Sequence, residues 1–206
     1  MLDRFHTDRI NNFCDAVFAI AMTLLILEIK VPNHEDMQTL GLLGCLQKLI
    51  PSFLGFLISF LVTAVYWRAH LSMAKFAKSY DNRQFWLTVW LLQFIVLLPF
   101  STALISEYFG NNHAWIFYSA NLVLIGLFHS LMVVNIIKKE GHSKELTPLH
   151  ARWMKMRAFM APLIWALSIA WIFVEPISAR FLFILIFIIQ GIMDRSFKKK
   201  IASSPS

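Results

Sequence analysis

The sequence predicts an all-α integral membrane protein in which six transmembrane helices form one domain. Of its 206 residues, 58% are hydrophobic and only 15% are charged, whereas a soluble domain carries about 25% charged residues. The apolar residues gather in blocks of about 20, the length of helix that crosses a bilayer. Such blocks exclude an outer-membrane barrel, whose strands alternate apolar and polar residues. We expect a six-helix transmembrane domain at residues 1–194 and a basic, disordered cytoplasmic tail at 195–206.

The first expected span, residues 9–31, contains the polar residues on which the functional prediction depends. One carboxylate, Asp15, lies near its start, and one hydroxyl, Thr23, interrupts its apolar run. Pro32 ends the span, because proline cannot continue a helix. No small-x-small cleavage site follows the apolar run, so we expect an uncleaved transmembrane helix and not a signal peptide.

Apolar blocks mark the other five expected spans, at residues 49–67, 85–105, 114–137, 158–174 and 179–193. The sixth is short for a transmembrane helix, so an interfacial position stays open for it. Pro99 and Pro162 fall within the third and fifth spans, and either proline could kink its helix.

The distribution of lysine and arginine predicts the orientation. Sixteen of the 19 basic residues fall in the N-terminal segment, in the loops after the second and fourth spans, and in the tail. Only Lys30, Lys48 and Arg180 lie on the other side. By the positive-inside rule both termini are cytoplasmic, and we expect a multi-pass protein of the cell inner membrane. The net charge of +7 is then a topology signal, and no nucleic-acid partner is expected.

The sequence gives little support to an enzyme. His70 and His129 lie in or near spans, but no nucleophile–base pair or set of metal ligands accompanies them. No metal and no cofactor are expected. Cys14 and Cys45 lie at opposite ends of the first span, about 30 Å apart, which is too far for a disulfide.

Six residues of the first span share one face of the helix at about 100° per residue. They are Phe13, Ala16, Ile20, Thr23, Leu24 and Leu27. Ordinary apolar packing is the common reason for such a stripe. In an oligomer the same stripe could line a pore with apolar rings and one hydroxyl position, although Thr23 could merely bond the carbonyl one turn back.

Asp15 lies across the helix from this stripe. A carboxylate within the membrane costs about 2.5–3.5 kcal/mol on insertion scales, so it needs a partner or water. Arg9, Arg68 and His70 are the candidate partners. Alternatively, Asp15 only favours the positive end of the helix dipole, and the sequence leaves both roles open.

Three segments of the chain resemble the bacterial TMEM175 family of potassium-permeable channels. The first is Arg9, then Phe13-Cys14-Asp15 and AVFAIAMTLLILEIKVP, which is similar to the family's Arg, three residues, Phe-Ser-Asp. The others are YWRAHLSMAKFAKSYDNRQFW at 66–86 and LLPFSTALISEY at 97–108. The resemblance covers the first half of the chain well. Cys14 replaces the family's serine and is a weaker hydrogen-bond donor, which puts the role of this position in question.

The resemblance implies six transmembrane helices per subunit and a homotetramer whose first helices line a central pore. It implies a pore constriction at Ile20, Leu24 and Leu27, with Thr23 setting the ion preference. It also implies a motif or gating network that comprises Arg9, Phe13, Cys14, Asp15 and His70. The chain has no Thr-Val-Gly-Tyr-Gly filter, which excludes a cage of backbone carbonyls.

The predicted function is therefore that of a channel with a passive potassium conductance and a modest preference for K⁺ over Na⁺. Its expected partners are the potassium ion, membrane lipid and three further copies of the chain. The alternative is a proton-coupled or other secondary transporter that uses Asp15, although clear paired broken helices are lacking. A purely structural membrane protein also stays open.

Overall fold

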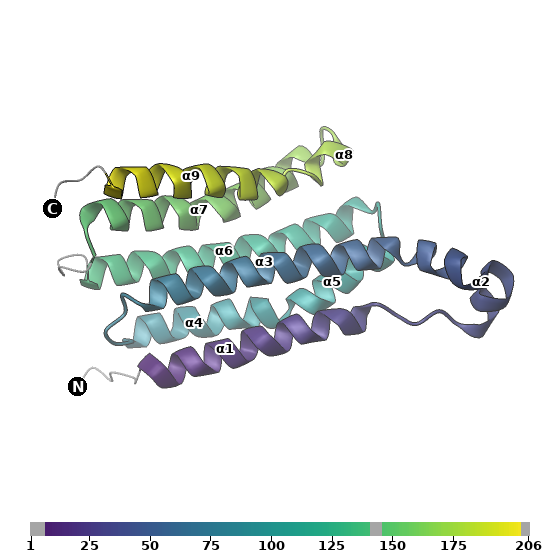
Figure 1. The fold of residues 1–206 in the computed structure, drawn as a ribbon, viewed down its shortest axis with the longest axis horizontal. Coiled ribbons are helices and arrows are strands. Elements are labelled where there is room, and N and C mark those ends of the chain that lie inside the picture. Colours follow the sequence, from purple (N-terminus) through teal and green to yellow (C-terminus); the bar gives the residue numbers. More distant parts are fainter. Residues whose placement is uncertain (1–6, 141–145, 203–206) are drawn as a thin grey trace.

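The computed structural model describes residues 7–140 and 146–202, which form a bundle of long helices (Figure 1). The long helices run side by side: α1 (Thr7–Leu24), α3 (Ile50–Ala74), α4 (Asn82–Val96), α6 (Asn112–Glu140), α7 (Pro148–Trp171) and α9 (Ile184–Ala202). Shorter elements connect or extend them: the 3₁₀ helix η1 (Leu25–Glu28), α2 (His34–Lys48), α5 (Leu98–Glu107) and α8 (Pro176–Ala179).

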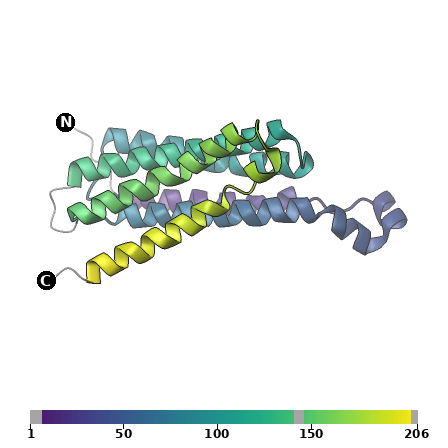
Figure 2. The same ribbon diagram turned by 90° about the horizontal axis from the view of Figure 1, so that it is seen from above.

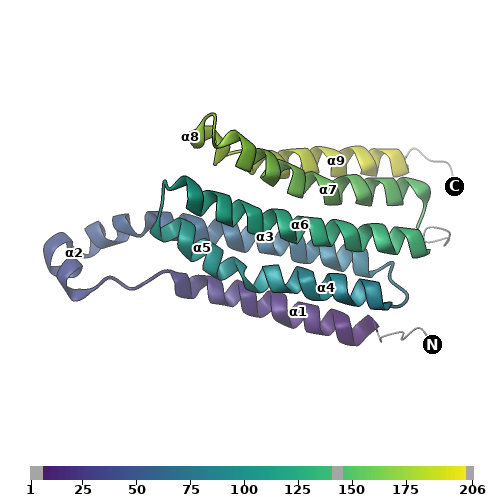
Figure 3. The ribbon, with the colours of Figure 1, turned by 180° about the vertical axis from the view of Figure 1, so that it is seen from behind.

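The helices lie in two layers. Seen from above, α4, α5, α6 and α7 form one layer, and α1, α3 and α9 form a second layer that faces it (Figure 2). In the face views α1 and α9 mark opposite edges of the bundle (Figures 1 and 3). The start of α1 and the end of α9 lie at the same end of the bundle, together with the turn that joins α3 to α4, the end of α6 and the start of α7.

Four stretches of the described chain are long and apolar enough to cross a membrane. They are Thr7–Glu28, His34–Ala74, Asn82–Glu107 and Asn112–Glu140. The expected fifth and sixth spans correspond to α7 and α9, which lie outside this set. Each is partly basic: α7 carries Arg152, Lys155 and Arg157 in its first half, and α9 carries Arg195 and the lysines that follow.

The first span ends earlier than the sequence predicted. It tightens into η1 at Leu25 and ends at Glu28, and the chain is extended from Lys30 to Asn33. The expected loop that follows is the helix α2, which extends beyond the bundle (Figure 1). Gly41 kinks α2 with φ of 65°, a left-handed conformation that glycine adopts without a steric penalty.

Pro99 breaks the third span, as the sequence allowed. Helix α4 ends at Val96 and α5 begins at Leu98, because proline has no amide to donate within the helix. The side-chain amide of Asn121 on α6 donates to the carbonyl oxygen of Phe94 at 3.2 Å, next to the break. By contrast, α7 remains one helix through Pro162.

The basic tail differs from the expected disordered segment over residues 195–202. These residues continue α9, since no glycine or proline interrupts them and lysine and arginine favour helices. Residues 203–206 lie outside the described part of the chain. Cys14 and Cys45 are both free thiols.

Candidate functional site

Helix α1 packs against the bundle along one narrow face. Its buried residues are Cys14, Phe18 and Ala21, and Leu25 of η1 continues the series; they are spaced four, three and four apart, and each is at most 2% exposed. This spacing keeps them on one side of the helix. The three residues of α1 join the hydrophobic core, and α1 contacts α3, α4 and α5.

No other part of the chain that the structure describes covers the opposite face of α1. All six residues of the predicted stripe are exposed: Phe13, Ala16, Ile20, Thr23, Leu24 and Leu27. Ile20 is 58% exposed and Leu27 is 70% exposed. The chain therefore presents a continuous apolar face, interrupted by one hydroxyl, at an edge of the bundle (Figure 3).

The 3₁₀ turn keeps Leu27 on this face. In a 3₁₀ helix, side chains three residues apart eclipse one another. Because η1 starts at Leu25, Leu27 lies almost directly beyond Leu24 along the helix axis. The two leucines thus form successive apolar layers.

The hydroxyl of Thr23 is oriented by the backbone. Its Oγ1 donates to the carbonyl oxygen of Ile20 at 2.8 Å. A hydroxyl that donates its one proton still has lone pairs that can accept or coordinate. On an exposed side chain, these lone pairs are the polar feature that the stripe offers to a cation.

Asp15 has a partner that the sequence did not predict. Its Oδ1 accepts a hydrogen bond from the indole Nε1 of Trp67 on α3, at 2.8 Å. Two of the expected partners lie elsewhere: Arg68 pairs with Asp194 of α9 at 3.7 Å, and Arg9 is exposed. No signal in the sequence pointed to this bond, because its two residues lie 52 positions apart on different helices.

His70 lies beside α1 and is fully buried. Its ring centroid is 6.1 Å from that of Phe18, and Asp15 is close enough to act on it electrostatically. Neither ring nitrogen has a hydrogen-bond partner among the described residues. Of the predicted network, Cys14, Asp15 and His70 thus gather where α1 meets α3, whereas Phe13 points away and is 62% exposed.

A second polar contact fixes the start of α1. The hydroxyl of Tyr80, which is fully buried, donates to Oδ1 of Asn11 at 3.0 Å. The turn between α3 and α4 therefore holds the first helix at the end opposite η1. The sequence had drawn attention to neither residue.

Comparison with known proteins places the chain among ion channels. Residues 9–99 match the family model described as the endosomal/lysosomal potassium channel TMEM175. A potassium channel of Chamaesiphon minutus is 39% identical over 132 residues, which span 64% of this chain and 64% of that protein. A potassium channel of a Chryseobacterium species is 27% identical over 194 residues and is covered to 96%.

The fold agrees with a solved structure. The crystal structure of a lysosomal potassium-selective channel TMEM175 homologue from Chamaesiphon minutus superimposes with a TM-score of 0.81 at 28% identity. The match covers 91% of this chain and 97% of that one. The chain is therefore similar, in sequence over residues 9–99 and in fold over nearly its whole length, to potassium channels of the TMEM175 family.

Proposed function

We propose that this chain is the subunit of a potassium-permeable channel in which the first helices of four copies surround a central pore. The observation that carries the proposal is the bare face of α1, which holds all six stripe residues on a helix otherwise packed into the core. Lipid tails are as apolar as leucine, so exposure of leucines alone suits either lipid or another subunit. The Thr23 hydroxyl and the similarity to potassium channels favour the pore.

In the proposed assembly each subunit crosses the membrane six times, with both termini in the cytoplasm of a bacterial cell. Two observations support this. The start of α1 and the end of α9 lie at one end of the bundle, as an even number of crossings requires (Figure 1). The turns at that end also carry most of the basic residues. Helices α7 and α9 are then the fifth and sixth spans.

The proposed gate is a hydrophobic constriction. Four copies of Ile20, Leu24 and Leu27 narrow the pore to a width at which water leaves it, and the pore conducts when these rings widen. The Thr23 hydroxyls ease the partial dehydration of a passing cation. Few fixed ligands replace the hydration shell of the ion, so the preference for K⁺ over Na⁺ is modest.

The direct test is potassium efflux from liposomes that contain the purified protein. Wild type is compared with Leu27→Ala and with Leu167→Ala. Leu167 is 53% exposed and belongs to α7, a helix that lies away from α1 in the bundle. We expect Leu27→Ala to increase efflux severalfold, because it removes the bulk of an apolar ring. Leu167→Ala should match wild type.

The outcomes separate the channel from the transporter. Efflux that needs no second solute and responds only to Leu27→Ala supports the pore. Equal changes of potassium efflux in both alanine variants would mean that α1 does not line the pore. Efflux that requires a gradient of protons or of another solute would identify a secondary transporter instead.

A further inference from the structure

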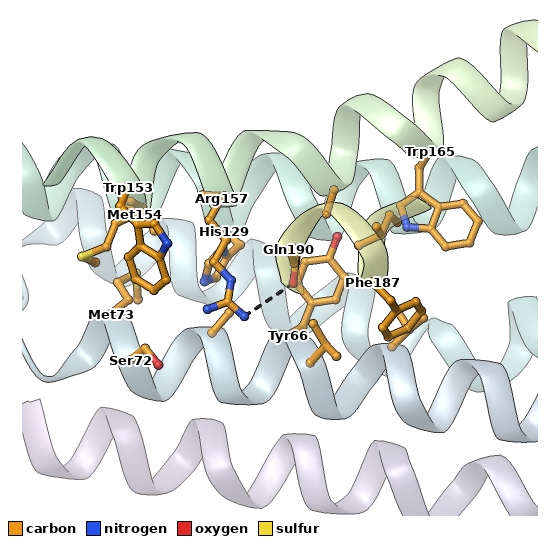
Figure 4. A pocket seen from close by; sticks show the side chains of 17 residues that line it. Tyr66, Ser72, Met73, His129, Trp153, Met154, Arg157, Trp165, Phe187 and Gln190 are labelled. Atoms are coloured by element: carbon orange, nitrogen blue, oxygen red, sulfur yellow. Dashed lines mark hydrogen bonds between the residues drawn. The ribbon is translucent and has the colours of Figure 1, made fainter. Parts of the chain in front are cut away.

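A cavity lies between α3, α6, α7 and α9, on the side of α3 away from α1 (Figure 4). Its volume is about 50 Å³. A water molecule needs about 10–15 Å³ on this measure, so the cavity accepts a group of roughly three to five non-hydrogen atoms. Most of the wall is apolar, formed by residues such as Val62, Val133, Trp165 and Phe187.

The polar part of the wall is cationic. The side chain of Arg157 is only 12% exposed and points from α7 towards α3 and α9 (Figure 4). Its guanidinium is 3.6 Å from Asp194 and 3.5 Å from the side-chain oxygen of Gln190. Both distances are long for bonds to a guanidinium, whose contacts with carboxylates usually measure about 2.7–2.9 Å.

Asp194 does not neutralise this region. The same carboxylate also serves Arg68 on α3, at 3.7 Å. Within the described residues, Asp194 is the carboxylate with which either arginine forms an ion pair. Two guanidinium groups therefore share one negative charge: that of Arg157 lines the apolar cavity, and that of Arg68 is on a side chain that is 70% exposed.

A further donor or acceptor at the cavity is unused. The ring of His129 is 5% exposed and lines the cavity, and its Nε2 has no hydrogen-bond partner among the described residues. A buried polar atom without a partner costs about 1–3 kcal/mol. The other ring nitrogen is hydrogen-bonded to the backbone of Ala69, so Nε2 of the neutral ring is an acceptor and bonds only a group that carries a proton.

We propose that this cavity binds the anionic group of an amphiphile, a lipid phosphate or a fatty-acid carboxylate. The group is held by the guanidinium of Arg157, and the apolar remainder lies along α9. A phosphate or carboxylate matches the size of the cavity and the fork of a guanidinium. The cavity lies towards the end of the bundle that carries most of the basic residues, and basic pockets between transmembrane helices at such ends bind anionic head groups.

The test measures bound amphiphile by native mass spectrometry of the full-length protein. The protein is supplied in turn with phosphatidylglycerol, oleate and the zwitterionic phosphatidylcholine. We expect retention of the two anionic amphiphiles and loss of phosphatidylcholine at the same activation energy. Retention of phosphatidylglycerol alone would identify lipid phosphate as the source, and retention of oleate alone would identify the free carboxylate. Equal retention of all three would overturn the proposal.

Two variants of α7 locate the site. Arg157→Gln removes the buried cation, and we expect about tenfold weaker binding of the anionic amphiphile, since one charge-assisted bond is worth about 1.5–3 kcal/mol. Lys155→Gln removes the same charge from an exposed position two residues away and should change binding less than twofold. Equal losses in both variants would show general surface attraction and contradict the assignment.

A third experiment uses only the wild-type protein, so it tests the site even if the Arg157→Gln variant does not fold. Wild-type protein is irradiated with a photoreactive fatty acid and a photoreactive phosphatidylglycerol, and the labelled peptides are mapped. Labels on α7 between Trp153 and Trp165, or on α9 near Phe187, support the cavity. Labels confined to other helices would exclude it.

Discussion

The hydrogen bond from Trp67 to Asp15 ties the first helix to its neighbour α3. We expect Trp67→Phe and Asp15→Asn each to lower the melting temperature, since each weakens the same bond of 2.8 Å. Because the site is partly exposed, the coupling in a double-mutant cycle should be about 1 kcal/mol. The ratio of K⁺ to Na⁺ flux should stay unchanged, because Asp15 lies on the packed side of α1. Intact protein with an altered flux ratio would assign Asp15 to the ion pathway.

Thr23 is predicted to act through its oxygen and not through its shape. Thr23→Val keeps the branched side chain but removes Oγ1, so the flux ratio of K⁺ to Na⁺ should fall towards one. Thr23→Ser keeps the oxygen and its bond to the carbonyl of Ile20, and should retain most of the preference. Flux of both ions from liposomes, measured on matched preparations, checks this. If the Thr23→Val variant keeps the wild-type ratio of K⁺ to Na⁺ flux, Thr23 is a packing residue and does not set the ion preference.

At this scale the sequence predicted the exposed stripe but not the bonds behind it. The stripe followed from the 3.6-residue repeat, which depends only on local geometry. The bond between Trp67 and Asp15 joins positions 52 residues apart, and nothing in either segment specifies which side chains face each other. The indole of a tryptophan near a helix end suits the headgroup zone as well as a buried carboxylate.

Helices α6 and α7 approach each other closely at Gly126. A Cβ atom at this position would lie 2.8 Å from Cδ of Pro162 and 2.8 Å from the hydroxyl oxygen of Tyr66. We therefore expect Gly126→Ala to destabilise the protein by about 1–3 kcal/mol, because the packed helices must separate. Gly191→Ala in α9 is the matched control, since its Cβ would meet nothing within 4 Å. Helix propensity predicts that this control is neutral or slightly stabilising.

Thermal unfolding of the two glycine variants in the same detergent measures the difference. A lower melting temperature for Gly126→Ala alone is the expected result. Comparable melting temperatures for both variants would mean that the α6–α7 contact accommodates the added methyl group without loss of stability.

Asp81 joins the start of α4 to the end of α6 outside the membrane-spanning segments. Its Oδ1 accepts from the amide of Gln84 at 2.8 Å, and its Oδ2 is 3.5 Å from Lys139. Partial burial acts to raise the pKa of Asp81, but the amide and the ammonium outweigh it and hold the pKa below 3.8. The stabilisation is thus present above about pH 4 and is lost as the pH falls through the lowered pKa.

Replacing this charge should therefore matter only at higher pH. Asp81→Asn keeps a cap for α4 but loses the ion pair, and should lower the melting temperature by about 2–4 °C at pH 7, as a loss of about 1 kcal/mol implies. At pH 3 the variant and wild type should converge. A difference that is the same at both pH values would attribute the effect to geometry and not to charge.

The elements themselves were predicted unevenly. Long apolar blocks located α1, α3, α4–α5 and α6, because a bilayer-length run leaves few other options. Helix α2 was missed, since Glu35, Asp36 and Gly41 give its sequence the composition of a loop. The side chain of Asn33 caps the first turn of α2. Asp36 forms an ion pair with Lys48 at 2.7 Å, which joins the two parts of α2 on either side of the kink at Gly41. A pair twelve residues apart is not visible to a local pattern.

At the scale of the whole molecule, the chain buries one face of α1 and leaves the other exposed. The core of the subunit could be predicted from hydropathy, but the assembly could not, because lipid and a second subunit are equally apolar neighbours. The distinction requires a probe that depends on several copies meeting at one axis. Cadmium is such a probe, because soft thiolate ligands bind it and one ion needs more than one of them.

Leu27→Cys should therefore make potassium flux sensitive to micromolar Cd²⁺. Four thiols at the constriction would surround one ion and block the pore, and a chelator should restore the flux. The native protein should be insensitive, because Cys14 and Cys45 are 0% and 1% exposed. Leu167→Cys places a single thiol on α7, a helix that lies away from α1 in the bundle, and is the matched control. Block in both variants would reflect general thiol chemistry, and no block with intact flux in Leu27→Cys would mean that the Leu27 side chains of the four copies do not meet.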